Sequence, residues 1–214
     1  MISKSSINIK IKQQVETGIS TLRQGGIVAF PTDTVYGLGA DINIPQAVER
    51  IYQVKKRLRN MALPLLVADR TQITKLAKRV PPIAWQLIEN FLPGALTLVL
   101  LKSKSVPDVI TGGGETVAIR IPNHPIPIAL IEGMGTPIIG TSANISGRSN
   151  PLTAGEVYSQ FGDKIDSIID GGQCPDSNVS TVVDVTGSVA IVLREGAISR
   201  EKLKLKCENI VYRE

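Results

Sequence analysis

Residues 27–30 read Ile-Val-Ala-Phe, a run of four apolar residues that ends abruptly at Pro31. The run predicts a buried strand, and Pro31 ends it because proline has no N–H to donate inside a sheet. Residues 31–39 then bring two hydroxyls, a carboxylate, a phenol and two glycines. Ligands of open α/β sheets bind beside loops that leave the carboxyl ends of strands. The segment is therefore a candidate ligand loop, or alternatively an ordinary loop whose threonine and aspartate side chains cap the next helix.

The rest of the chain alternates between predicted helices and strands. Apolar residues at helical spacing predict helices at residues 10–24, 45–54, 71–78, 82–91, 126–132 and 153–161. Apolar runs predict strands at residues 27–30, 65–68, 95–101, 117–121, 137–140, 165–169, 181–185 and 190–193. We therefore expect an α/β fold, a twisted open mixed sheet with flanking helices. We expect one domain over residues 1–214, with its core at about 10–200 and a C-terminal tail at 201–214.

The composition of the chain indicates the cellular setting and the kinds of binding partner to expect. Apolar residues make up 43% of the chain and aromatic residues only 4%, so the core must be aliphatic. The net charge of +5 favours anionic partners such as nucleotides, phosphates or RNA, unless the basic surface is inert. Two cysteines without CxxC spacing and a single histidine do not make a zinc site, which favours a reduced, cytoplasmic setting. No segment reaches the 18 or so apolar residues of a membrane span, so no membrane partner is expected.

Four cations fall within five residues at the end of the predicted helix that begins at Pro45. Residues 55–59 read Lys-Lys-Arg-Leu-Arg. Cations there complement the negative end of the helix dipole, which is the purely structural explanation. The functional explanation is an anion clamp, because Lys55 offers a point charge and Arg57 a planar fork for phosphate oxygens.

A polar loop follows the predicted strand at residues 137–140. Most of residues 141–150 are hydroxyls, amides, glycine or arginine. Such a loop can present N–H groups and hydroxyls to phosphate or ribose, although a polar surface loop is the simpler reading. The chain has neither a GxxxxGK[ST] motif nor a GxGxxG motif between a strand and a helix. A bound nucleotide would therefore be held without the common fingerprints.

Hydroxyls and arginines also stand on later strands or at their ends. Thr116 and Arg120 share one face of a strand, where a buried cation requires a ligand or an internal ion pair. Ser180 and Arg194 lie at the ends of the last two predicted strands. His124 lies in a proline-rich turn, and no Ser/His/Asp triad or metal-binding set of carboxylates is apparent. This chemistry suits binding of an anionic substrate and charge stabilisation in phosphoryl or nucleotidyl transfer.

Ordered motifs resemble the YrdC/Sua5 family of threonylcarbamoyl-AMP synthases over about residues 10–200. The motifs are FPTDTVYGLGAD at 30–41, KxR at 55–57, LPLLVAD at 63–69, PGALTLVL at 93–100, TVAIRIPNHP at 116–125, GTSANISGRSNP at 140–151, STVVDV at 180–185 and LREGAIS at 193–199. Each motif alone is weak evidence. Their order and spacing together are highly specific.

The resemblance implies a fold and a reaction. The fold is a twisted α/β sheet around a large, positively charged concave cavity. In the reaction, L-threonine, bicarbonate or CO2, and ATP give L-threonylcarbamoyladenylate and pyrophosphate, with Mg2+ carried by ATP. A downstream transferase complex then forms N6-threonylcarbamoyladenosine in tRNA. The chain itself would resemble the short, single-domain form.

The resemblance also implies roles for individual residues. Lys55 and Arg57 would act on the phosphates as the catalytic pair. Threonine would be bound by Thr34, Arg120, Gly140 and Ser180. ATP would be bound by Arg57, Thr116, Ser142, Asn144, Asn150 and Arg194.

The chain departs from the family pattern in two places. Leu63 stands where relatives carry asparagine, after a segment about two residues longer, and Ala68 stands where relatives often carry histidine. Two other functions are compatible with the same residues. One is a double-stranded RNA or tRNA-binding module of the same fold without catalysis. The other is a carbamoyl-adenylate enzyme for another acceptor, as in hydrogenase maturation, whose zinc-finger cysteines are lacking here.

Overall fold

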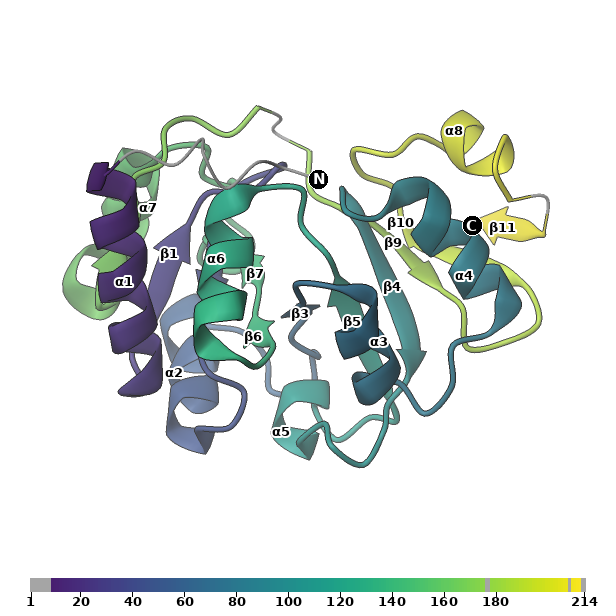
Figure 1. Ribbon diagram of the computed structural model, residues 1–214, viewed down its shortest axis with the longest axis horizontal. Coiled ribbons are helices and arrows are strands. Elements are labelled where there is room, and N and C mark those ends of the chain that lie inside the picture. The colour runs from purple at the N-terminus through teal and green to yellow at the C-terminus, as the bar shows by residue number, and fades with distance from the viewer. Residues whose placement is uncertain (1–8, 176–177, 208, 213–214) are drawn as a thin grey trace.

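Figure 1 shows the computed structural model, which describes residues 9–175, 178–207 and 209–212. Within these ranges the strands divide between two open sheets rather than the single sheet expected. The smaller sheet has the order β7-β2-β1-β8 and is built from β1 (Val28–Phe30), β2 (Gly37–Gly39), β7 (Thr141–Ser142) and β8 (Ser167–Ile168). The prediction of an α/β fold with open mixed sheets and flanking helices is confirmed.

The larger sheet carries the longest strands. Its order is β11-β10-β9-β4-β5-β3-β6 in the part of the chain that the structure describes. The strands are β3 (Leu65–Leu66), β4 (Leu96–Leu101), β5 (Thr116–Arg120), β6 (Ile138–Ile139), β9 (Thr181–Asp184), β10 (Ala190–Arg194) and β11 (Ile210–Tyr212). The β4–β5 pair is antiparallel, whereas β4 and β9 run parallel. Gly140 alone separates β6 from β7, so the chain passes there from one sheet to the other.

Helices cover the sheets, as Figure 1 shows. They are α1 (Ile9–Arg23), α2 (Pro45–Lys55), α3 (Arg70–Leu76), α4 (Pro82–Phe91), α5 (Asp108–Thr111), α6 (Pro125–Met134), α7 (Ala154–Phe161), the short 3-10 turn Gly162–Lys164 and α8 (Arg200–Lys204). One aliphatic core lies under α2, α3 and α4, and a smaller one lies between α1, α6 and β1. Within the described ranges, none of the helices combines the length and apolar character that a membrane crossing requires.

Several segments form regular structure that the sequence did not predict, among them α5, β7, β2, α8 and β11. Residues 37–39, expected as part of a ligand loop, form β2, which pairs with β1 between Phe30 and Gly37. A Cβ atom on Gly39 would lie 2.7 Å from the Phe30 ring, so the glycines here make room for an aromatic side chain. Residues 200–212, expected within or beside the tail, supply α8 and β11, and β11 pairs with β10.

Candidate functional site

A cavity of about 250 Å³ lies between the two sheets, above one face of the larger sheet. Both sheets and the segment after α2 contribute to its lining: Thr34, Val35, Arg57, Ala62, Pro64, Leu66, Thr97, Ala118, Arg120, Gly140, Thr141, Ser142, Val179, Ser180, Val182 and Arg194. This set includes three arginines and, among the described residues, no carboxylate. The cavity therefore presents positive charge and hydroxyls to a ligand.

Strand register explains why these residues meet. Val99 pairs with Ala118 and Thr97 pairs with Val182, so alternate residues of β4, β5 and β9 face the same side. The cavity lies on that side. The opposite face is aliphatic except for Thr181, whose hydroxyl donates to the Ile198 carbonyl, and it packs into the main core, as Leu98 does. The floor of the cavity is thus set by the alternation of the strands.

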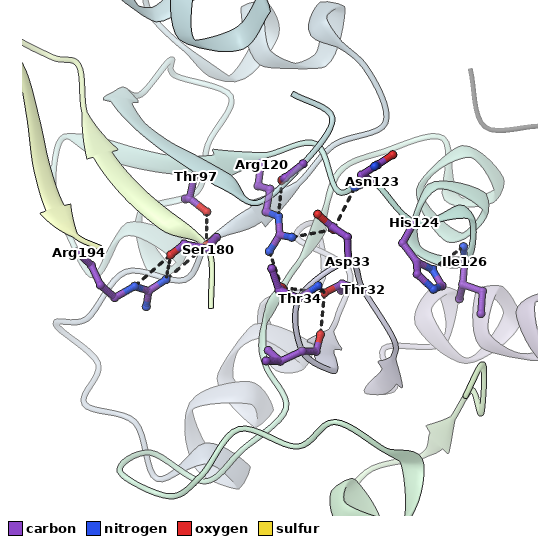
Figure 2. Close-up of polar contacts among 12 residues, drawn as sticks. Thr32, Asp33, Thr34, Thr97, Arg120, Asn123, His124, Ile126, Ser180 and Arg194 are labelled. Carbon is purple, nitrogen blue, oxygen red and sulfur yellow. Dashed lines mark hydrogen bonds and ion pairs between the residues drawn. The ribbon is translucent and has the colours of Figure 1, made fainter. Parts of the chain in front are cut away.

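Arg120 connects the floor to the loop that leaves β1. Its guanidinium donates to Asp33 Oδ1 at 2.7 Å, to Thr34 Oγ1 at 3.0 Å and to the Gly94 carbonyl at 2.9 Å (Figure 2). Burial lowers the pKa of Arg120, and the Asp33 charge opposes that shift. Of the two explanations for a buried arginine, the structure shows the internal ion pair. The guanidinium has five N–H groups, and two of them have no partner among the described residues.

Arg194 and Thr97 approach Ser180 from two sides, as Figure 2 shows. Arg194 donates from Nη2 to the Ser180 carbonyl at 2.8 Å, and Thr97 Oγ1 lies 2.7 Å from Ser180 Oγ. The pKa of Arg194 is lowered by burial first, and then by the positive charges of Arg120 and Arg57. All three arginines line the same cavity, so they can act together on an anion bound there.

Arg57 holds the segment that connects α2 to β3. Its side chain donates to the carbonyls of Met61 at 3.3 Å and of Ala62 at 2.8 Å. The single hydrogen of the Tyr52 hydroxyl can be donated to the Val109 carbonyl at 3.0 Å or to the Met61 carbonyl at 3.2 Å. These contacts hold the segment beside the cavity, which Ala62 lines.

Lys55 lies behind the cavity wall rather than on it. Its side chain is 1% exposed, and Nζ donates to the carbonyls of Ser142 and Asn144 and, at 3.4 Å, to Asn144 Oδ1. Burial lowers the Lys55 pKa to about 7, and the Arg57 charge adds to the shift. Lys55 is therefore not part of the cavity lining, and its role on the phosphates stays a prediction. A contact between Lys55 and phosphate would require Nζ to face the cavity, whereas its donors are taken by the polar loop.

Asn144 organises that loop from inside. Its Oδ1 accepts from Ser142 Oγ at 2.6 Å, and its Nδ2 donates to the Arg148 carbonyl at 2.7 Å. Among the residues implied as ATP contacts, Asn144, Thr116 and Asn150 are not part of the cavity lining. Thr116 is the first residue of β5, and Asn150 precedes Pro151 at the far end of the loop. Their contacts with ATP stay a prediction.

Gly140 joins the two sheets at the cavity wall. A Cβ atom there would lie 2.1 Å from Leu66 Cγ, so any side chain would displace a residue that also lines the cavity. Of the residues named from the sequence, the structure brings a subset to the cavity: Thr34, Arg57, Arg120, Gly140, Ser142, Ser180 and Arg194.

The histidine and the two cysteines of this chain are not part of the cavity lining. His124 caps α6, because its Nδ1 accepts from Ile126 N at 3.2 Å (Figure 2). Cys174 and Cys207 are buried thiols. Across the described ranges, no cluster of three or more His, Cys, Asp or Glu side chains could hold a metal ion.

Sequence reasoning missed Thr97, which lines the cavity beside Ser180. The sequence does contain an indication of this role, because Thr97 is the one residue with a hydroxyl in the β4 sequence Leu-Thr-Leu-Val-Leu-Leu. The apolar lining residues Leu66 and Val182 carried no such signal, since their side chains look like those of any core strand.

This chain is similar to proteins of one known family. The pattern of the Sua5/YciO/YrdC family, described as telomere recombination, matches residues 20–196. A relative from Pyrococcus abyssi named threonylcarbamoyl-AMP synthase is 43% identical, over 93% of this chain and 60% of its own length. One of the same name from Bacillus subtilis is 40% identical, over 89% of this chain and 56% of its own length.

A solved structure shows that the similarity extends to the three-dimensional fold. The crystal structure of Pyrococcus abyssi Sua5 complexed with L-threonine superposes with a TM-score of 0.90 and 43% identity, over 93% of this chain and 58% of that one. The chain thus spans less than two thirds of the length of these relatives. On the family match and these identities, the chain belongs to the Sua5/YciO/YrdC family.

Proposed function

We propose that this chain is an L-threonylcarbamoyladenylate synthase. It would convert L-threonine, bicarbonate or CO2, and ATP into threonylcarbamoyl-AMP and pyrophosphate. The observation that carries the proposal is the convergence of three arginines with the hydroxyls of Thr34, Ser142 and Ser180 on one cavity. The names of the relatives and the threonine complex of Pyrococcus abyssi Sua5 support it.

The threonine end of the site would lie at the floor of the cavity. Arg120 keeps two N–H groups beyond its three protein contacts, and a carboxylate is the best acceptor for such a fork. Thr34 and Ser180 would complete the pocket with their hydroxyls, and Gly140 would leave room for the substrate. Asp33 and the Gly94 carbonyl hold the Arg120 plane in one orientation, which is the pre-organisation that such a contact requires.

The nucleotide end would lie toward Arg57, Ser142 and Arg194. Arg57 and Arg194 would bind the phosphates and stabilise the charge that develops on the departing pyrophosphate. Lys55 would act indirectly, holding the carbonyls of the 142–144 segment so that the Ser142 hydroxyl and nearby N–H groups face the nucleotide. Asn144 would fix the same loop, and Thr116 and Asn150 would complete the ATP contacts at its ends.

Two steps then account for the product. The threonine amine nitrogen bonds to the carbon of CO2 and loses a proton, which gives a carbamate. A carbamate oxygen next attacks the α-phosphorus of ATP, and the bond from that phosphorus to its bridging oxygen breaks to release pyrophosphate. Positioning and positive charge suffice for both steps, so no covalent intermediate with the protein is required.

Mg2+ would enter as part of the substrate. The described residues that line the cavity include no carboxylate, and oxygen ligands of that kind are what a protein-held Mg2+ site needs. The ion would therefore be held by the phosphates of ATP. The proposal has three further parts. The product would pass to a threonylcarbamoyl-transferase complex and be used in tRNA modification. The chain would also contact tRNA directly, and it would act in the cytoplasm.

Pyrophosphate release from ATP tests the proposed function. Release should require both L-threonine and bicarbonate, and omission of either should reduce it to background. Release that persists without threonine and bicarbonate would contradict the assigned reaction. Absence of release, combined with salt-sensitive binding of double-stranded RNA or tRNA, would instead favour the binding module.

A further inference from the structure

Thr97 is a polar side chain in the middle of an aliphatic strand. It is 4% exposed, its neighbours in β4 are leucine and valine, and it lines the cavity. Burying a hydroxyl is unfavourable unless it is hydrogen-bonded. A valine of nearly the same shape would pack equally well against the strand neighbours. Packing alone therefore does not explain why a residue with a hydroxyl occupies this position.

The hydroxyl groups of Thr97 and Ser180 together have one hydrogen that the contact between them does not use. Each hydroxyl has one hydrogen and can accept as well. The 2.7 Å contact between Thr97 Oγ1 and Ser180 Oγ uses one hydrogen, whichever residue donates it. Arg194 approaches Ser180 Oγ at 3.4 Å and is a donor only, so it accepts nothing. Among the described residues, the second hydroxyl hydrogen of the pair has no acceptor, and both residues line the cavity.

Thr97 also lies close to the proposed carboxylate contact. Leu98 pairs with Ile119 in the β4–β5 ladder, and Thr97 and Arg120 are the next positions outward on the two strands. Both line the cavity. An oxygen atom at the floor could thus accept from the arginine fork and from the hydroxyl pair together, whereas an ammonium group could accept from neither.

We propose that Thr97 is a positioning residue for the amino-acid substrate, and that its contact with Ser180 directs one O–H of the pair to a substrate oxygen. The inference rests on the proposed function and adds a residue to its threonine site. Thr97 fixes the rotation of the Ser180 hydroxyl, and Arg194 holds the Ser180 backbone from the opposite side. Loss of the Thr97 hydroxyl would leave Ser180 free to turn away from the substrate.

Three variants test the inference. Thr97→Val removes the hydroxyl and keeps the branched shape, Thr97→Ser keeps the hydroxyl, and Thr111→Val is the matched control. Thr111 is also 4% exposed, but its hydroxyl donates to the Asp108 carbonyl and it does not line the cavity. In the pyrophosphate assay, Thr97→Val should raise the KM for L-threonine about fivefold to tenfold, the effect of one lost hydrogen bond. Its kcat and its KM for ATP should stay within about twofold of the wild type.

The remaining measurements separate positioning from a structural effect. Thr97→Ser should restore the threonine KM to within about twofold of the wild type. An unchanged threonine KM in Thr97→Val, or an equal rise in the KM values for threonine and ATP, would overturn the inference.

Titration calorimetry with L-threonine distinguishes failure of this inference from failure of the proposed function. Wild-type protein that binds threonine without releasing pyrophosphate would contradict the synthase, and weaker binding by Thr97→Val would still support the inference. Wild-type protein that binds no threonine would overturn both.

Discussion

Thr34 and Arg120 are 86 positions apart in the sequence, yet Arg120 Nη1 donates to Thr34 Oγ1 at 3.0 Å. The contact joins the loop that leaves β1 in the smaller sheet to the last residue of β5 in the larger one. Thr34 in turn lies 3.0 Å from the hydroxyl of Thr32, which donates to the Val35 carbonyl. The cavity wall is therefore one hydrogen-bonded unit built from both sheets, and a change at any member should be felt by the others.

Removal of Asp33 should destabilise the fold. The Asp33→Ala variant would leave the 7% exposed Arg120 without its carboxylate partner, and breaking a buried pair in this way costs about 3–5 kcal/mol. Asp33→Asn should lose less, because an amide oxygen can still accept from Arg120 and from Asn123 N. Urea unfolding measures the difference.

Glu49→Ala is the matched control for Asp33, because Glu49 pairs with Arg59, whose side chain is 73% exposed. An exposed pair of this kind contributes about 0–1 kcal/mol. Equal losses of unfolding free energy in Asp33→Ala and Glu49→Ala would show that the Arg120 pair is no stronger than a surface contact.

The buried Lys55 should make stability depend on pH. Its pKa is about 7 in the folded protein against 10.5 as the ordinary value, so between these two pH values the unfolded chain binds more protons. The free energy of unfolding should therefore rise with pH in that window, by at most about 1.4 kcal/mol per pH unit. In Lys55→Met this contribution is absent. Urea unfolding of both proteins at pH 7.5 and 9.5 should show the wild type gaining about 2 kcal/mol relative to the variant.

The same variant probes the loop that Lys55 holds. Because Nζ donates to the carbonyls of Ser142 and Asn144, Lys55→Met should also lower turnover, by about tenfold or more. Lys56→Met serves as the control, since Lys56 is the exposed neighbour that follows α2. A stability difference between wild type and Lys55→Met that stays constant with pH would mean that the lysine is not held as the structure has it.

Gly196 should tolerate no side chain. A Cβ atom there would lie 2.2 Å from the Val179 carbonyl oxygen and 2.7 Å from the Ser180 carbonyl carbon, and backbone atoms cannot turn aside as a side chain can. Gly196→Ala should therefore displace Ser180 and lower kcat/KM for pyrophosphate release by about tenfold or more. In Gly155→Ala the nearest atom to the new Cβ is Thr153 Oγ1 at 3.9 Å, so activity and Tm should stay the same or Tm should rise slightly. Similar kinetics for the two alanine variants would argue against a role for this close approach.

Arg57 should matter for its planar fork as well as for its charge. Arg57→Ala should lower kcat/KM for ATP at least about tenfold, which is about 1.4 kcal/mol of barrier. Arg57→Lys should recover only part of that loss, because an ammonium lacks the planar fork that donates to the Met61 and Ala62 carbonyls and can bind two phosphate oxygens side by side. Arg59→Ala, two positions on and exposed, should keep ATP kinetics close to the wild type. Full activity of Arg57→Lys would restrict the role of this residue to its charge.

Local patterns in the sequence predicted most of the scaffold. The helix that begins at Pro45 and the one at residues 82–91 follow from apolar spacing and from proline at the first turn. Strand β4 follows from its aliphatic run. These features depend on neighbours within a few residues, which is the range that a sequence pattern can record.

Other features depend on contacts between distant segments. Gly37 and Gly39 read as turn residues, but they form a strand because the Phe30 ring occupies the space of their missing side chains. The sequence presents Lys55 as a cation at a helix end or in an anion clamp, but the loop at residues 142–144 encloses it and supplies its acceptors. Nothing local to either segment signals these outcomes.

The sequence by itself determined the aliphatic strands, the main helices, the family pattern and the set of hydroxyls and cations available for chemistry. Only the tertiary structure decided how that set divides. Arg57, Arg120 and Arg194 line the cavity, Lys55 lies behind its wall, and Thr97 joins Ser180 at its floor. The physical reason is that strand register and burial select which face of each strand a side chain occupies. Register is fixed by pairing with strands far away in the chain.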